Sequence, residues 1–150
     1  MKVVLSAIGK AKAGPEQQLY QEYVKRVPWP ISCREFDIKL NDIAQRKMRE
    51  GEQLLSGVSS CDRIIALDET GKTFSSPEFA GQLKNWQQQG NSSFGFIIGG
   101  SDGLSPEVLN KAHLVWSFGR VTYPHMLVRA LLAEQLYRAH TIISGHPYHK

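Results

Sequence analysis

The chain has 150 residues, of which 41% are apolar, so it is long enough for one hydrophobic core and too short for two comfortable domains. No apolar run approaches a membrane span, and the two cysteines, Cys33 and Cys61, have neither Cys-x-x-Cys spacing nor the density of a secreted disulfide scaffold. The formal net charge of +4 is compatible with nucleic acid as a partner without requiring it. We therefore expect one cytoplasmic domain, residues 1–150, with reduced cysteines.

The spacing of apolar residues predicts strands and helices that alternate along the chain. The first apolar run is too short for a signal peptide and predicts a strand instead. In chain order we expect a strand at Val3–Ile8, a helix from Pro15 to about Val27, a strand at Cys33–Leu40, a helix after Asp42 through Leu55, a strand at Arg63–Leu67, a helix from Ser75 to about Gln89, a strand at Phe94–Ile98, a helix from Ser105 to about Ala112, a strand at Leu114–Ser117 and a long helix from Pro124 onwards. Imperfect alternation at residues 33–40 indicates a half-exposed or edge strand.

Strands that alternate with helices are typical of an α/β fold, here a single-domain and mainly parallel sheet with helices on both faces. Ligands of such sheets bind at the carboxyl ends of the strands. Three segments follow buried strands and are the candidate ligand loops: Leu67–Lys72, Gly99–Leu104 and Phe118–Tyr123. The polar residues Asp68–Lys72 are expected to form a turn that ends their strand.

The loop Gly99-Gly100-x-x-Gly103 allows two interpretations. Its glycines would let backbone groups approach a ligand closely, or they would serve a strand-to-helix turn that needs positive φ. The spacing matches neither G-x-G-x-x-G nor the phosphate-binding G-x-x-x-x-G-K-[ST] pattern, which argues against NAD and ATP.

Basic residues and histidines gather in the last third of the chain. Residues 115–150 contain four basic residues and a single acid, Glu134, and so carry +3 of the net charge. The basic residues are Arg120, Arg129, Arg138 and Lys150, and the histidines, all from residue 113 onward, are His113, His125, His140, His146 and His149. This distribution points to an anionic partner and to possible proton transfer at this end.

The long C-terminal helix has two informative spacings. Arg129 and Arg138 are nine positions apart and therefore face opposite sides, whereas Glu134 and Arg138 are four apart and can pair. Apolar residues cover too broad an arc for a helix that touches only a sheet, which suggests a self-association surface. His146 and His149 are three apart, but no cysteine or carboxylate lies near enough to complete a metal site, so we predict no metal.

Several motifs occur in order along the chain: Leu67-Asp68 with Gly71-Lys72, Ile98-Gly99-Gly100-x-x-Gly103-Leu104, Thr122-x-Pro124-His125-x-x-x-Arg129, Glu134-Gln135-x-Tyr137-Arg138-Ala139 and Pro147-Tyr148-His149-Lys150. Together they resemble the bacterial large-subunit (23S) ribosomal RNA pseudouridine N3-methyltransferases, small members of the SPOUT class. The resemblance spans the whole chain, with its motifs concentrated from residue 64 to the end. Any one motif alone would be unspecific.

The resemblance implies a C-terminal trefoil knot, a homodimeric active form, and S-adenosylmethionine held where the three candidate loops converge. The family's cofactor positions correspond to Leu67, Gly99, Phe118, Gly119, Arg120, Val121, Thr122 and Tyr123. The family pattern has serine and methionine where this chain has Gly119 and Val121, and often arginine where it has Lys150. A lysine keeps the charge but loses the bidentate geometry toward phosphate.

The same resemblance implies methyl transfer to N3 of a pseudouridine in 23S rRNA of the assembled ribosome. Because an imide nitrogen is a weak acid, we expect groups near the base to stabilise its anion and accept its proton. The candidate catalytic residues are Arg138, Tyr148 and His149, the last as proton acceptor or orienter, and Lys150 joins them in substrate binding. Arg129, His125 and Glu134 are expected in supporting or dimer-interface roles.

Three alternatives remain open from the sequence alone. A SPOUT enzyme could instead methylate a ribose 2′-hydroxyl. A non-catalytic ribosome-binding factor would use the same basic end without a cofactor. A flavodoxin-like nucleotide binder would need phosphate-loop spacing that the glycine loop lacks.

Overall fold

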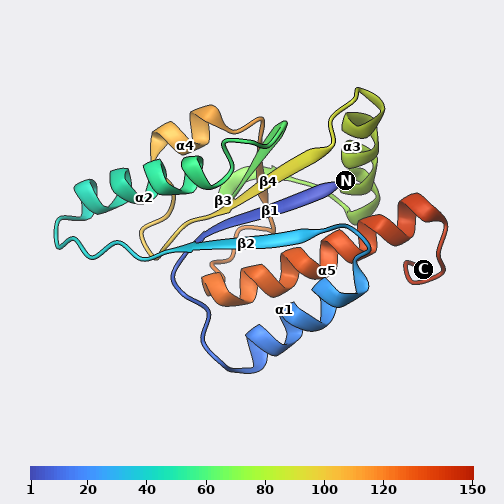
Figure 1. The fold of residues 1–150 in the computed structure, drawn as a ribbon, viewed down its shortest axis with the longest axis horizontal. Coiled ribbons are helices and arrows are strands. Elements are labelled where there is room, and N and C mark those ends of the chain that lie inside the picture. Colours follow the sequence, from blue (N-terminus) through green and yellow to red (C-terminus); the bar gives the residue numbers. More distant parts are fainter.

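Five parallel strands form one sheet in the order β2-β1-β4-β3-β5 in the computed structural model, which describes residues 1–150 (Figure 1). The strands are β1 (Lys2–Ile8), β2 (Ile31–Phe36), β3 (Arg63–Thr73), β4 (Ser93–Ile98) and β5 (Leu114–Ser117). The helices are α1 (Pro15–Arg26), α2 (Ile43–Gly57), α3 (Ser76–Gln88), α4 (Pro106–Lys111) and α5 (His125–Ser144). The predicted single-domain α/β sheet is therefore confirmed, and the trefoil knot stays a prediction.

Side chains of the inner strand β1 alternate between two hydrophobic clusters. Val3 and Leu5 belong to the larger cluster, which contains buried residues of α3 and α5, whereas Val4 packs with residues of α2 and α4 on the opposite face. Helices thus cover both faces of the sheet, as the strand-helix alternation predicts. None of these helices combines the length and apolar character needed to cross a membrane.

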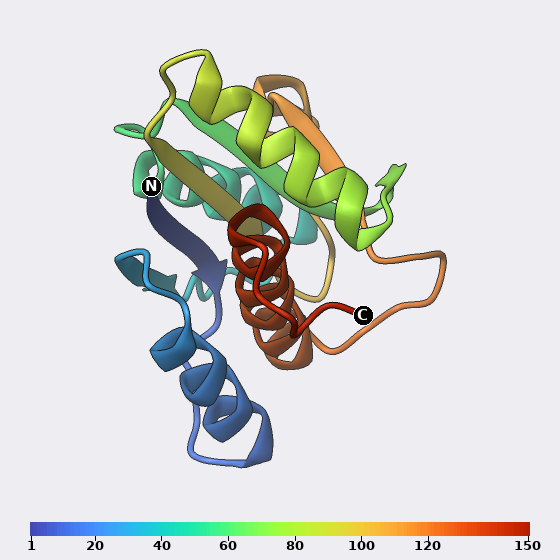
Figure 2. The ribbon, with the colours of Figure 1, turned by 90° about the vertical axis from the view of Figure 1, so that its right-hand side faces the viewer.

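Helix α5 lies between α1 and α3 on one face of the sheet (Figure 2). Its buried residues include Ala130, Leu132, Leu136 and Ala139, which occupy several sides of the helix. Neighbours on both flanks and the sheet below account for the broad apolar arc that suggested self-association. The arc is therefore explained within one chain, and the homodimer stays a prediction.

The helix ends follow the expected capping chemistry. Ser75 and Glu78 form the predicted capping box at the start of α3, in which the Ser75 backbone N–H donates to the Glu78 carboxylate at 2.7 Å. Asp42 caps α2 and Ser105 caps α4 through their side-chain oxygens. Local sequence alone is sufficient for these boundaries.

The second strand differs from its prediction, because it spans Ile31–Phe36 and not Cys33–Leu40. The last residue pair with β1 joins Ile8 to Phe36, and β1 ends at Ile8. Residues 37–40 therefore have no neighbouring strand, despite their alternating pattern.

The third strand also differs, because it continues through Thr73 where a terminating turn was predicted. Both Leu67 and Lys72 pair with Trp116 of β5, so residues 68–71 bulge out of the ladder before the chain rejoins it. A Cβ on Gly71 would lie 2.6 Å from the backbone carbonyl carbon and oxygen of Val115, so only glycine allows this close return.

The packing of α2 on β4 leaves no room beside Gly95, which gives a first prediction. A Cβ at this position would lie 2.6 Å from Val58 Cβ, so Gly95→Ala should lower the free energy of unfolding by about 1–3 kcal/mol. Gly81→Ala is the matched control, since nothing lies within 4 Å of it on α3 and the change should be neutral or stabilising by about 0.5–1 kcal/mol. Urea unfolding of both variants measures this, and equal stability of Gly95→Ala and the wild type would contradict the packing described.

Candidate functional site

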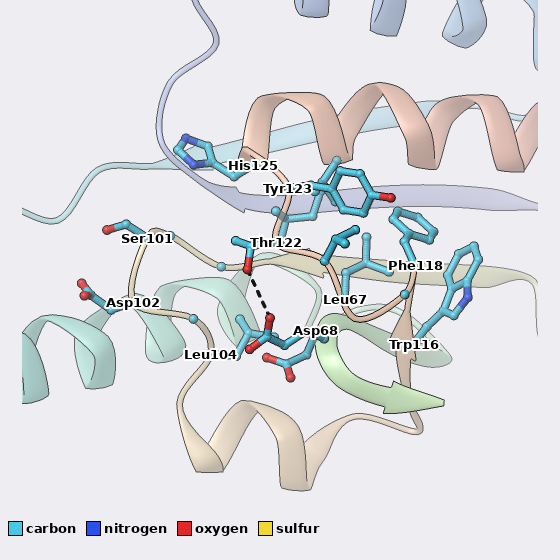
Figure 3. A pocket seen from close by; sticks show the side chains of 18 residues that line it. Leu67, Asp68, Ser101, Asp102, Leu104, Trp116, Phe118, Thr122, Tyr123 and His125 are labelled. Carbon is cyan, nitrogen blue, oxygen red and sulfur yellow. Dashed lines mark hydrogen bonds between the residues drawn. The ribbon is translucent and has the colours of Figure 1, made fainter. Parts of the chain in front are cut away.

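The bulge of β3 and the carboxyl ends of β4 and β5 surround a cavity of about 380 Å³ (Figure 3). All three candidate ligand loops contribute to its wall, so the structure brings them together at one place. The lining residues are Leu67, Asp68, Glu69, Ile98, Gly99, Gly100, Ser101, Asp102, Gly103, Leu104, Trp116, Phe118, Gly119, Val121, Thr122, Tyr123, His125 and Val128. We call this the first cavity.

The first cavity is acidic. Its lining includes Asp68, Glu69 and Asp102 but neither lysine nor arginine. Thr122 Oγ1 donates to Glu69 at 3.4 Å, drawn as a dashed line in Figure 3, and Asp102 pairs with Arg46 of α2. Such a lining favours a ligand that carries positive charge and disfavours a phosphate group.

The glycine loop forms the positive-φ turn that was one of its two interpretations, and the approach of its backbone to a ligand stays a prediction. Gly103 has φ of 77° and donates its backbone N–H to the Gly100 carbonyl at 3.1 Å, which is the positive-φ turn. A Cβ on Gly99 would lie 2.9 Å from Leu104 Cδ2, so this glycine permits a close approach of two chain segments at the cavity wall.

The loop after β5 is held by the Ser117 hydroxyl. This hydroxyl donates to the Gly119 carbonyl at 2.8 Å and accepts from the Gly119 N–H at 3.0 Å. Gly119, which stands where the family pattern has serine, has φ of 121°. This conformation favours glycine and explains the departure from the family pattern. Of the eight expected cofactor residues, all line the first cavity except Arg120, which is exposed.

Arg129 is almost fully buried, with 1% of its surface exposed, and it joins α5 to the chain that follows β1. Its guanidinium pairs with Glu35 and donates to the carbonyl oxygens of Ile8 and Gly9. Glu35 in turn accepts the Ala11 N–H at 2.8 Å. Arg129 therefore fixes α5 to the loop after β1 within one chain, and it lies apart from the C-terminal residues.

The C-terminal residues form a second polar group, which we call the tail cluster, around Glu134. Arg138 donates to Glu134 from Nε at 2.9 Å and from Nη2, and Tyr148 donates to the same carboxylate at 3.2 Å. A hydrogen bond with Tyr23, burial and the Glu134 charge raise the pKa of Tyr148, so its hydroxyl stays protonated. Arg138 Nη1 lies 3.2 Å from His149 Nδ1.

The tail cluster and the first cavity lie at opposite ends of α5. Val128 lines the cavity, and Arg138 follows ten residues later, about 15 Å along the helix. Figure 1 shows the C-terminus beyond the far end of α5. Within one chain, Arg138, Tyr148 and His149 therefore come together with one another but not with the cavity, and Lys150 is exposed.

The sequence did not identify Trp116 or Val128 as part of the site. Each is adjacent to a feature that was identified, since Trp116 is in β5 and Val128 is one helical turn after His125. Apolar residues in a strand or helix carry no sequence signal for ligand contact. No group of histidine, cysteine, aspartate and glutamate side chains is arranged to hold a metal ion.

Comparison with known sequences gives full-length matches. Residues 1–149 match the family described as "Predicted SPOUT methyltransferase". The protein named "Ribosomal RNA large subunit methyltransferase H" from Paramagnetospirillum magneticum is 47% identical over 152 residues, covering 100% of this chain and 99% of that one. Its namesake from Rhodospirillum centenum is 42% identical over 151 residues with the same coverage.

Two solved structures share the fold at low sequence identity. A probable methylase family protein from Haemophilus influenzae has a TM-score of 0.63 at 10% identity and covers 99% of this chain and 70% of its own. A probable methyltransferase from Bordetella pertussis has a TM-score of 0.63 at 12% identity. The match covers 92% of this chain and 95% of that one. At these identities the likeness is one of fold.

The imidazole of His125 at the edge of the first cavity gives a prediction on pH. Burial and the positive charge of Arg129 lower the pKa of His125 below its ordinary value of 6.5. In the unfolded chain His125 binds a proton at a higher pH than in the folded chain. The free energy of unfolding should therefore decrease as pH falls below about 6.5. Urea unfolding between about pH 7.5 and 5.5 should show a smaller loss in His125→Gln than in the wild type. An NMR titration midpoint for His125 at or above 6.5 would contradict this assignment.

Proposed function

The chain belongs to the SPOUT methyltransferase family, and from that premise we propose that it transfers a methyl group from S-adenosylmethionine to N3 of a pseudouridine in 23S ribosomal RNA. Relatives that share more than 40% of its sequence over its full length are named as large-subunit ribosomal RNA methyltransferases. These names favour an enzyme over a non-catalytic ribosome-binding factor. The motif Pro147-Tyr148-His149-Lys150 resembles that of the pseudouridine N3-methyltransferases, which favours base methylation over ribose methylation.

The observation that carries the cofactor assignment is the acidic first cavity. S-adenosylmethionine supplies a methyl group activated on a positively charged sulfonium sulfur. The carboxylates of Asp68 and Glu69 complement that charge, and a volume of about 380 Å³ is in the range of small-molecule sites. The residues that would hold it are Leu67, Gly99, Phe118, Gly119, Val121, Thr122 and Tyr123.

The tail cluster has the donors that the substrate requires. N3 of pseudouridine must lose its proton to accept the methyl group, and the resulting charge spreads onto the two flanking carbonyl oxygens. Arginine only donates hydrogen bonds, so His149 Nδ1 accepts from Arg138 Nη1. The proton of the neutral His149 ring is then on Nε2. In this arrangement His149 Nε2 and the remaining N–H groups of Arg138 stabilise the anion as donors, while the Tyr148 hydroxyl donates to Glu134. The N3 proton passes to water.

We assign the tail to a site across a homodimer. The tail cluster lies about 15 Å along α5 from the first cavity of its own chain, too far for one chain to bring both to the same nucleotide. In a dimer the tail of one subunit would cover the cofactor of the other. The basic end of the chain, including Lys150, would then face the ribosomal RNA in the cytoplasm.

The proposed function predicts methyl transfer to purified large ribosomal subunits. Incubation with S-adenosylmethionine should place one methyl group on N3 of a pseudouridine, identified by mass spectrometry of the digested RNA. Isothermal titration should show saturable binding of S-adenosylmethionine to the protein alone. Methylation of a ribose 2′-hydroxyl would support the other SPOUT activity, and absence of cofactor binding would exclude both.

Deletion of residues 146–150 gives a second prediction. Methyl transfer should fall by about a hundredfold or more, because Tyr148, His149 and Lys150 are lost, while cofactor affinity stays within about twofold. Activity equal to that of the full chain would contradict the role of the tail.

Mixed dimers test whether the tail acts across the interface. A truncated subunit should regain activity when it is co-expressed with Gly99→Leu, whose side chain would collide with Leu104 and block the cofactor. Neither variant should be active alone. A mixed dimer that stays inactive would indicate a tail that serves its own chain.

A further inference from the structure

Residues 9–14, which join β1 to α1, contain two exposed lysines, Lys10 and Lys12, that the proposed function leaves unused. The segment has no acidic residue, and neither lysine forms an ion pair with any other part of the chain. We call it the lysine loop. We propose that the lysine loop binds backbone phosphates of the ribosomal RNA strand beside the nucleotide whose base is methylated.

The lysine loop lies at the rim of the first cavity. Figure 1 shows it at the same end of the sheet as the start of α5. A Cβ on Gly9 would lie 3.1 Å from His125 Nε2, and a Cβ on Gly100 would lie 3.1 Å from Ile8 Cγ2. Both His125 and Gly100 line the first cavity. Lys10 therefore follows directly after a residue that packs against the cavity wall.

Hydrogen bonds hold the backbone of the lysine loop in place before any ligand arrives. The Ala11 N–H donates to Glu35 at 2.8 Å, and Glu35 pairs with the buried Arg129. The guanidinium of Arg129 also donates to the Gly9 carbonyl oxygen. Because Ala11 lies between the two lysines, these bonds fix the segment from which both side chains extend. A loop held in this way loses little backbone entropy when a ligand binds.

The first cavity and the lysine loop at its rim have charges of opposite sign. The cavity lining has Asp68, Glu69 and Asp102 but no lysine or arginine, whereas the loop has two lysines and no acid. A nucleotide combines a neutral base with a negatively charged phosphate. The carboxylates therefore disfavour entry of the phosphate, and the lysines attract it to the rim. Together they direct the base toward the cofactor and keep the backbone outside.

Lysine suits a contact that reads the backbone and not the base. Its ammonium is a compact charge with three donors on a flexible stem, so it reaches phosphate oxygens in many orientations. Phosphate contacts fix the position of a nucleic acid and carry no sequence information directly. This inference rests on the proposed function, since it adds contacts to the same RNA substrate. The acceptor site over the first cavity stays as assigned.

The salt dependence of binding to purified large ribosomal subunits tests the inference. Protein saturated with S-adenosylhomocysteine is titrated at salt concentrations between about 50 and 200 mM, and each phosphate contact contributes about 0.7–0.9 to the slope of log K against log salt. The Lys10→Gln/Lys12→Gln variant should lose about 1.4–1.8 from that slope and bind at least about tenfold more weakly at about 100 mM salt. An unchanged slope would overturn the inference. Weaker binding with an unchanged slope would instead assign the loop to a ribosomal protein.

Lys2→Gln/Lys84→Gln is the matched control, because it removes the same charge from two exposed lysines away from the rim. Lys2 begins β1 and pairs with Ser93 at the amino edge of the sheet, and Lys84 lies in the second half of α3, which leads to that edge. The affinity of this control should stay within about twofold of the wild type, since salt screens distant charges. An equal loss in both double variants would indicate an effect of net charge and contradict a contact at the lysine loop. Lys10→Arg/Lys12→Arg keeps the charge and should keep the slope.

Methylation kinetics separate this contact from the cofactor and from the reaction. Backbone contacts bind the ground state and the transition state alike, so in Lys10→Gln/Lys12→Gln the KM for large subunits should rise about tenfold while kcat stays within about twofold. Affinity for S-adenosylmethionine should also stay within about twofold, and a tenfold loss would assign the lysines to the cofactor carboxylate instead. Methyl transfer by the wild type with an unchanged KM in the variant would leave the proposed function standing and exclude only the lysine loop. Failure of the wild type to methylate large subunits would remove both.

Discussion

The return of β3 to the sheet after a bulge is the constraint on which the rest of the site depends. Leu67 and Lys72 both pair with Trp116, so the intervening residues are forced out of the ladder. The excluded segment places Asp68 and Glu69 in the wall of the first cavity. Gly71 makes this path possible because any side chain there would meet the Val115 backbone. Two of the three carboxylates of the cavity therefore owe their position to one irregularity in the sheet.

A buried charge holds the opposite side of the same rim. Arg129 is surrounded by the chain and still satisfies most of its donors, through Glu35 and two carbonyl oxygens at the end of β1. Loss of one partner of such a pair would leave an uncompensated charge in the interior, so the arrangement is strongly specified. It fixes the start of α5, and with it His125 and Val128, against the loop after β1. This part of the cavity wall is thus set by an ion pair that lies outside the cavity lining.

The charge of the first cavity matches one substrate of a methyl transfer. It has carboxylates and no lysine or arginine, which suits a cationic sulfonium. The Ser117 hydroxyl, bound to Gly119 on two sides, keeps the loop after β5 in one conformation. One wall of the cavity is therefore built into a short segment held by its own hydrogen bonds.

Local sequence determined the order of strands and helices, the capped starts of α3 and α4, and the three loops at the carboxyl edge of the sheet, because each depends on neighbours within a few residues. It also pointed to most of the residues that line the first cavity. Only the tertiary structure decided where β2 ends, since Ile8 and not the pattern of residues 37–40 limits the pairing. The rejoining of β3 to β5, the burial of Arg129 and the unpaired indole of Trp116 depend likewise on residues distant in sequence. Contacts of that kind leave no periodicity in the chain, and they form only when the packed sheet brings their partners together.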